Sequence, residues 1–192
     1  MNIKTVIKIS SISGILLPFV FLIGLLISII RAPWFNWTEY AISDLGKIDV
    51  GFQSFNITLF FVGVLLLIFS FGLYYSLKTE RISPTILAIS SLYFIAVGIY
   101  PLPSPIHIDF SGLLFISFPL SFFTLGIQLY KKKEPFIKKM AEYALIMSVV
   151  SACSPIFLLF NPGIAIPEMI ILVPGFFWCC RYGLYMQFSQ SI

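Results

Sequence analysis

The run ISSISGILLPFVFLIGLLISII, residues 9–30, decides the fold class of this chain. It holds no charged side chain and lies between Lys8 and Arg31. A hydrocarbon core about 30 Å thick needs roughly 20 apolar residues of α-helix, so this run is long enough to cross a bilayer. It is longer than the about 7–15 apolar residues of a cleavable signal peptide, and no Ala-x-Ala site follows it. We therefore expect a retained transmembrane helix.

Five further apolar runs of similar length follow. The predicted membrane helices span residues 9–30, 54–77, 83–101, 111–130, 140–160 and 165–187. The connections are short and no Gly- or Ser-rich linker divides the chain, so neighbouring helices should be antiparallel and adjacent. The sequence predicts one domain over residues 1–192, an all-α polytopic membrane protein built as a bundle of six transmembrane helices.

Composition supports the same class. Hydrophobic residues make up 59% of the 192 residues and charged residues 10%, whereas soluble domains are about 45–50% apolar and about 25% charged. This excludes a soluble enzyme, a disordered segment, a disulfide-stapled secreted module and a nucleic-acid-binding protein. The three cysteines, Cys153, Cys179 and Cys180, are expected to be small buried hydrophobes rather than a disulfide framework.

The basic residues predict the orientation. With the N-terminus in the cytoplasm, only Arg31 and Lys47 fall on the outer side, and Arg181 can snorkel to the inner interface. The cytoplasmic side then carries Lys4, Lys8, Lys78, Arg81, Lys131, Lys132, Lys133, Lys138 and Lys139. This positive-inside bias predicts a multi-pass protein of the cell membrane with both termini cytoplasmic.

Acidic residues and the single histidine gather on the opposite, outer side. They are Glu39, Asp44, Asp49 and Asp109 in or next to the outer loops, Glu168 near the start of the last helix, and His107. Histidine is the side chain whose ordinary pKa lies nearest neutrality, which makes His107 a catalytic candidate, although a lone histidine in a loop is more often a hydrogen-bonding residue. We therefore expect any polar site to face outward.

The first outer loop, residues 31–53, is rich in aromatic residues suited to the headgroup region. Residues 38–45 are predicted to form a short interfacial helix that ends at Gly46, where glycine suits a C-terminal cap with positive φ. In the second outer loop, Pro101, Pro103 and Pro105 alternate and predict an extended segment. That segment would present His107 and Asp109 just before the fourth helix, with Asp109 or Ser111 as its cap.

Several short motifs in this region carry a family resemblance. They are Ile42-Ser43-Asp44-Leu45-Gly46, Phe55-Asn56, Gly98-Ile99-Tyr100-Pro101 and His107. Together they resemble the prokaryotic membrane family called domain of unknown function 998, over the first four helices, while the last two helices match only as apolar segments. The first two motifs also resemble, more loosely, the first outer loop of the Frag1/DRAM/Sfk1 membrane proteins. The family resemblance implies architecture and directs attention to Asp44, Asn56 and His107, but it implies no activity.

Each candidate residue has a structural and a chemical interpretation. Asp44 either fixes its loop through an Asx-type bond or acts as an acid or headgroup ligand, with Asp109 and His107 as the other catalytic candidates. Asn56 should face the bundle and hydrogen-bond the first outer loop, because a lipid-facing amide would be unpaired. Glu39, Ser43, Asn56 and Glu168 are the candidates for ligand or headgroup binding.

The sequence leaves any cofactor unknown. The chain has no HExxH, paired-histidine or CxxC spacing, so no metal site is predicted. A Ser-His-Asp arrangement would have to use Ser43 or Ser104 with His107, and no GxSxG elbow is present.

Three functions remain open. The preferred one is a non-catalytic subunit or scaffold of a membrane complex, with the lipid bilayer and partner subunits as its surroundings. The alternative is a lipid-headgroup-binding protein or lipid-modifying enzyme with its site at the outer interface. A small transporter ranks last, because transporters place ionisable groups near the bilayer midplane and none is expected there.

Overall fold

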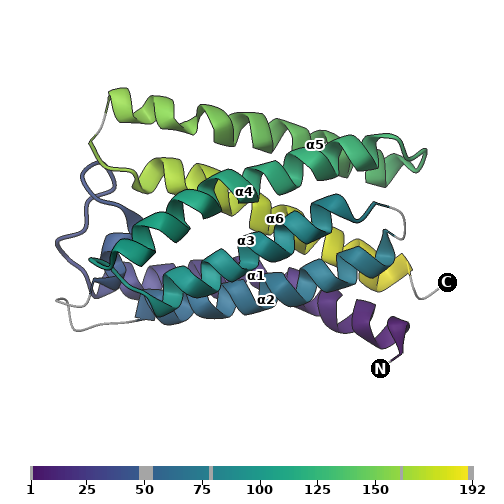
Figure 1. The fold of residues 1–192 in the computed structure, drawn as a ribbon, viewed down its shortest axis with the longest axis horizontal. Helices are drawn as coiled ribbons and strands as arrows, with labels where there is room; N and C mark the ends of the chain where they lie inside the picture. Colours follow the sequence, from purple (N-terminus) through teal and green to yellow (C-terminus); the bar gives the residue numbers. More distant parts are fainter. Residues whose placement is uncertain (1, 48–53, 78–79, 161, 190–192) are drawn as a thin grey trace.

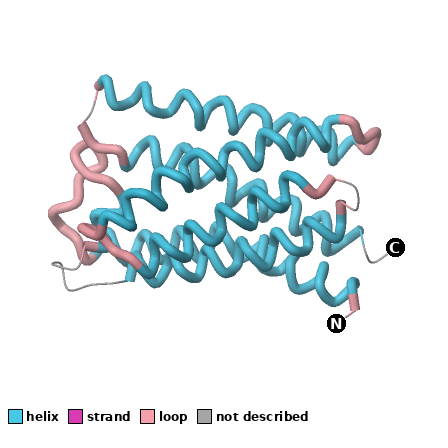
Figure 2. Tube along the Cα trace, viewed as in Figure 1, coloured by secondary structure: helices cyan, strands magenta, loops and turns pink. Residues whose placement is uncertain are grey.

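A computed structural model of the chain describes residues 2–47, 54–77, 80–160 and 162–189. Asp49 and Lys78 lie outside these ranges. The described residues form six long helices joined by short connections (Figures 1 and 2). The helices are α1 Ile3–Ile30, α2 Ser54–Ser76, α3 Ile82–Ile99, α4 Pro105–Tyr130, α5 Pro135–Cys153 and α6 Ala165–Ser189. All six are long and apolar enough to cross a membrane, which confirms the predicted all-α six-helix bundle.

The helices run up and down, so the bundle has two unlike ends (Figure 1). One end, here called the long-loop end, carries the α1–α2, α3–α4 and α5–α6 connections, including the short 3₁₀ helix η1, Ile42–Gly46. The other, the terminal end, carries both termini and the α2–α3 and α4–α5 connections. Consecutive helices pack side by side, and α6 also packs against α1.

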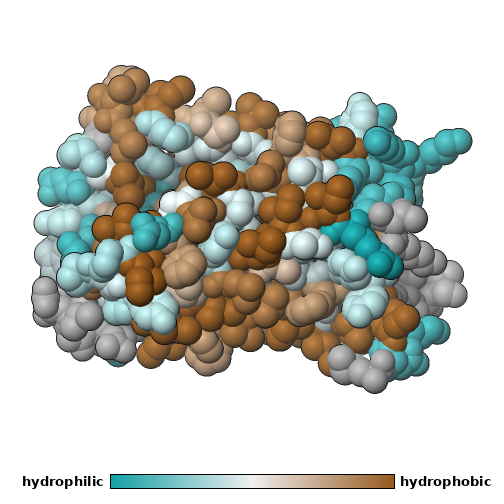
Figure 3. Space-filling model, viewed as in Figure 1, coloured by the Kyte–Doolittle hydropathy of each residue, from teal (hydrophilic) through white to brown (hydrophobic). Residues whose placement is uncertain are grey.

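Large apolar side chains cover the outside of the bundle as well as its core. Figure 3 shows brown residues over the middle of the visible face and teal residues gathered at the terminal end. The core is aromatic, with Phe176 lying 5.0 Å from Phe21 and 5.7 Å from both Phe94 and Phe118, measured between ring centroids. An apolar exterior of this kind is stable only in lipid, and it confirms an integral membrane protein.

Buried hydroxyl groups join neighbouring helices inside the bundle. Ser10 Oγ donates to the Ile68 carbonyl at 2.7 Å and so links α1 to α2. Ser90 Oγ donates to Ser117 Oγ at 2.8 Å and links α3 to α4. Serine is small, so it permits the helices to approach closely. Its hydroxyl also needs a partner within the bundle, because the hydrocarbon around the helices offers no hydrogen-bonding group.

Three predicted helix starts lie too late in the sequence. α1 begins at Ile3, α4 at Pro105 and α5 at Pro135, although positions 9, 111 and 140 were expected. Proline occupies the first turn of α4 and α5, where its fixed φ suits a helix and its missing N–H costs nothing. His107 and Asp109 therefore lie in the first turns of α4, not in the loop before it, and Ser104 is the N-cap residue in place of Asp109 or Ser111.

Two further local predictions need correction. The expected interfacial helix over residues 38–45 is only the 3₁₀ turn Ile42–Gly46. The predicted fifth helix changes at its end into a 3₁₀ segment, η3 Ser154–Leu159, because Pro155 cannot donate the next α-helical hydrogen bond. Cys179 is buried as expected, whereas Cys153 is exposed on the surface of the bundle.

Candidate functional site at the long-loop end

Asp44 closes the η1 turn from within. Its Oδ2 accepts a hydrogen bond from the Ala41 backbone N–H at 2.8 Å. Its Oδ1 pairs with Lys47 Nζ, also at 2.8 Å. The Asp44 side chain therefore bonds nearby backbone, which is the arrangement that the structural interpretation of this residue predicted.

Glu168 of α6 hydrogen-bonds the start of the same turn. It lies in the first turn of α6, only 4% exposed, and its Oε2 accepts a hydrogen bond from the Ile42 N–H at 2.6 Å. Two acidic side chains thus receive the N–H groups of adjacent residues, Ala41 and Ile42. The contact fixes η1 to a helix that starts more than 120 residues further along the chain.

Asn56 of α2 hydrogen-bonds the end of η1. This residue of the first turn of α2 is 4% exposed, and its Nδ2 donates to the Gly46 carbonyl at 2.7 Å. The predicted hydrogen bond from Asn56 to the first outer loop is therefore present. Its Oδ1 is buried and has no hydrogen-bond partner among the described residues.

Gly46 is required by this contact and not by its φ angle. A Cβ atom built at position 46 would lie 2.1 Å from Asn56 Oδ1, far inside van der Waals contact. The backbone at Gly46 does not adopt the positive φ that a C-terminal glycine cap was expected to have. Glycine is needed here because the amide of Asn56 occupies the space that a side chain would fill.

His107 is buried beside the end of α3. It is 2% exposed, and its Nδ1–H donates to the Tyr100 carbonyl, with 2.9 Å between nitrogen and oxygen. Its Nε2 is also buried and makes no hydrogen bond within the described part of the chain. His107 and Glu168 lie in the first turns of α4 and α6, at the same end of the bundle as Asp44.

Two other predicted site residues are exposed. Glu39 accepts a hydrogen bond from Asn36 Nδ2 at 3.1 Å, and Asp109 lies on the surface of α4. Ser43 lies within η1, next to Asp44. Asp44, Asn56, His107 and Glu168, which we call the η1 clasp, are the predicted residues whose side chains bond the backbone at the long-loop end.

A small cavity lies beneath η1. Its volume is about 20 Å³, and Ser43, Ser111 and Glu168 are its polar lining among apolar side chains of α2, α3, α4 and α6. Space of this size holds about one water-sized ligand. Among the described residues no three His, Cys, Asp or Glu side chains are arranged to hold a metal ion. The geometry therefore suits hydrogen bonding within the loop better than chemistry on a large substrate.

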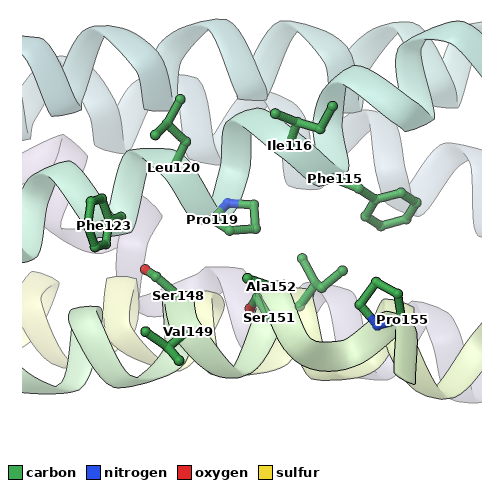
Figure 4. Close-up of a pocket in the computed structure, with 11 residues that line it drawn as sticks. Phe115, Ile116, Pro119, Leu120, Phe123, Ser148, Val149, Ser151, Ala152 and Pro155 are labelled. Atoms are coloured by element: carbon green, nitrogen blue, oxygen red, sulfur yellow. The ribbon is translucent and has the colours of Figure 1, made fainter. Parts of the chain in front are cut away.

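A second feature lies on the side of the bundle, between α4 and α5. Figure 4 shows an open groove there, which has a volume of about 570 Å³. Pro119 and Phe123 line it from α4, and Ser148, Ser151 and Ala152 line it from α5. The sequence predicts a stripe of small side chains on the fifth helix, Ala144, Ser148 and Ala152, as a face for close helix approach, but it does not predict a groove. Ser148 and Ala152 of this stripe line the groove, together with Pro155.

The small side chains of the groove differ in their hydrogen bonding. Ser148 Oγ donates to the Ala144 carbonyl at 2.6 Å. Ser151 is 3% exposed, and its Oγ is buried with no partner in the described ranges. An unpaired hydroxyl among apolar side chains costs about 1–3 kcal/mol relative to a paired one.

Fold and site together define the class of this protein: a six-helix integral membrane protein whose longest described loop is fixed to the bundle by buried polar side chains. Residues 15–184 match the family described as Protein of unknown function (DUF998), and the chain belongs to that family. The match includes α5 and most of α6, so the family likeness extends beyond the first four helices. No curated protein and no solved structure matches the chain.

Proposed function

We propose that this protein is a non-catalytic subunit or scaffold of a membrane complex, and that a transmembrane helix of its partner occupies the α4–α5 groove. The observation that carries the proposal is the open groove between α4 and α5, whose α5 side is lined by the small side chains of Ser148, Ser151 and Ala152. The η1 clasp supports the non-catalytic part, because Asp44 and Glu168 each receive a backbone N–H and Asn56 donates to a backbone carbonyl.

A helix fits this groove better than a lipid chain does. Ser148, Ser151 and Ala152 are small, so a second backbone can approach closely, as helices do in membranes. The groove therefore favours a protein occupant.

The distribution of charge supports the orientation within this proposal. Lysines gather at the terminal end, and this end faces the cytoplasm under the positive-inside rule. The long-loop end with its clasp then faces outward from the cell membrane.

Site-specific photocrosslinking in the native membrane tests the proposal. A photoreactive residue replaces exposed Ala152 in the groove, and a matched control replaces exposed Ile23 on α1. We expect position 152 to give one protein adduct of fixed mass, whose crosslink maps to a transmembrane helix of a different protein, and position 23 to give only lipid adducts. Lipid adducts alone at position 152, or a second copy of this chain, would overturn the heteromeric subunit.

A second candidate function is supported by a different observation. Within the clasp, His107 Nε2 and Asn56 Oδ1 are buried and have no hydrogen-bond partner among the described residues, which suits a lipid-headgroup-binding or lipid-modifying site at the outer interface. This function requires that His107→Ala abolishes headgroup binding or turnover while the protein still folds. Unchanged lipid co-purification in His107→Ala and Asp44→Asn would exclude it. A transporter has less support, since Glu168, His107 and Asp109 lie in the first turns of their helices.

A further inference from the structure

Basic side chains form one surface at the terminal end. Lys131 and Lys133 lie in the α4–α5 connection, Lys138 and Lys139 lie in the first turns of α5, and Arg181 lies on α6. All five are exposed. We call this set the basic cluster.

The acidic side chains near the cluster do not neutralise it, because they are fewer than the basic ones and two of them have other partners. Glu80 pairs with Lys132 at 2.8 Å, and Glu134 accepts hydrogen bonds from the backbone N–H groups of Phe136 and Ile137. Glu142, one turn after Lys138 and Lys139, adds one further negative charge. The cluster therefore keeps a net positive charge.

Aromatic rings position two of these cations. The guanidinium carbon of Arg181 lies 5.6 Å from the centre of the Phe136 ring, and Lys138 Nζ lies 5.2 Å from the centre of the Tyr130 ring. Phe136 stacks on Tyr185 of α6 with 4.7 Å between ring centroids. Lys139 follows Phe136 by three residues, so helical spacing places it on the side of α5 that carries this ring.

The position of Arg181 suits an anion at the membrane interface. Its guanidinium lies beside Phe136, the second residue of α5, and therefore at the level of the α4–α5 connection with its lysines. The apolar spans of α4 and α5 end at this connection. A lipid headgroup sits at the same interface, where it meets both the loop lysines and the Arg181 guanidinium.

From this arrangement we propose that the basic cluster binds the phosphate headgroup of an anionic phospholipid, with Arg181 and Lys139 beside Phe136 as the main contacts. Aromatic residues enriched at membrane interfaces and polybasic segments beside membrane helices are both suited to such a headgroup. This inference stands independently of the partner helix in the α4–α5 groove and requires no assumption about which end faces the cytoplasm.

Native mass spectrometry of the full-length protein tests the site. Phosphatidylglycerol and phosphatidylcholine with identical acyl chains are the probes. The variant Lys139→Gln/Arg181→Gln is compared with Lys4→Gln/Lys8→Gln, which removes the same charge from exposed positions at the same end of the bundle. We expect about fivefold weaker phosphatidylglycerol binding for each cation lost in the cluster, from about 1 kcal/mol per basic residue near an anionic surface.

The controls distinguish a specific phosphatidylglycerol site from general attraction between a positive protein and an anionic lipid. The charge-conserving variant Lys139→Arg/Arg181→Lys should fold and bind phosphatidylglycerol at near wild-type strength, and phosphatidylcholine binding should be weak throughout. Equal loss in Lys4→Gln/Lys8→Gln would overturn the proposal, because it would show attraction to net charge alone. Equal binding of the two lipids by the wild-type protein would overturn it as well.

Discussion

The two ends of the bundle use polar side chains in opposite ways. At the long-loop end, Asp44, Asn56, His107 and Glu168 turn toward the bundle and bond the backbone. At the terminal end, the charged side chains are mostly exposed and lie on the surface. A buried group that loses its partner is costly, whereas an exposed ion pair contributes little, so substitutions at the two ends should differ sharply in effect.

The difference between the two ends also indicates different roles: the η1 clasp stabilises the structure, and the basic cluster is suited to recognition. The η1 clasp fixes a loop and leaves little space, about 20 Å³, for anything else. The basic cluster fixes nothing comparable and presents charge outward. Stability measurements should therefore respond to the long-loop end, and lipid binding should respond to the terminal end.

Gly46→Val should have the largest effect on stability. Its Cβ would lie 2.1 Å from Asn56 Oδ1, so the buried Asn56 side chain, η1 or the start of α2 must move. We expect a loss of about 3 kcal/mol or more, at the upper end of overpacking costs. Thermal unfolding in detergent measures it. Gly112→Ala is the matched control, since nothing lies within 4 Å of its Cβ, and a similar loss there would contradict the steric argument.

Glu168→Ala should have the next largest effect. It leaves the Ile42 N–H without its acceptor and opens space beside the small cavity. We expect a loss of about 1–3 kcal/mol, the cost of leaving a buried N–H group unsatisfied. Glu168→Gln keeps an acceptor oxygen and should lose less. Glu39→Ala, at an exposed position, should leave the unfolding midpoint unchanged.

Much of the fold follows from the sequence, because bilayer thickness imposes length and hydropathy on each helix. Asn56 was predictable for a related reason: an amide near a helix start in lipid needs a partner, and a loop lies within reach. The starts of α4 and α5 were not predicted, since Pro105 and Pro135 were read as loop residues although proline also suits the first helical turn.

Other features depend on distant parts of the chain. The bond from Ile42 to Glu168 and the α4–α5 groove arise from the packing of helices far apart in sequence. No local pattern around Ser151 shows that its hydroxyl lacks a partner. The sequence places Glu39, Asp44, Asp109 and Glu168 on the same side of the membrane. It does not show which face of its helix each residue occupies, and in the structure Asp109 is exposed whereas Glu168 is buried.

Asp44→Asn should have a modest effect at the long-loop end. The asparagine carbonyl oxygen can still accept the Ala41 N–H, whereas the ion pair with Lys47 is lost. Lys47 Nζ is substantially exposed, and such pairs contribute about 0.2–1 kcal/mol. We expect a decrease within that range in the same thermal assay. Asp44→Ala removes the acceptor too and should lose distinctly more; equal losses would contradict the backbone role of Asp44.

Lys132→Gln tests the terminal end and should have the smallest effect. It removes the 2.8 Å pair with Glu80, whose two side chains are 39% and 20% exposed. Solvent screens a pair with this exposure, so we expect less than about 1 kcal/mol of change in the free energy of unfolding. A loss as large as that of Glu168→Ala would contradict the contrast between the ends. It would mean that the α2–α3 and α4–α5 connections hold the bundle together as firmly as the η1 clasp does.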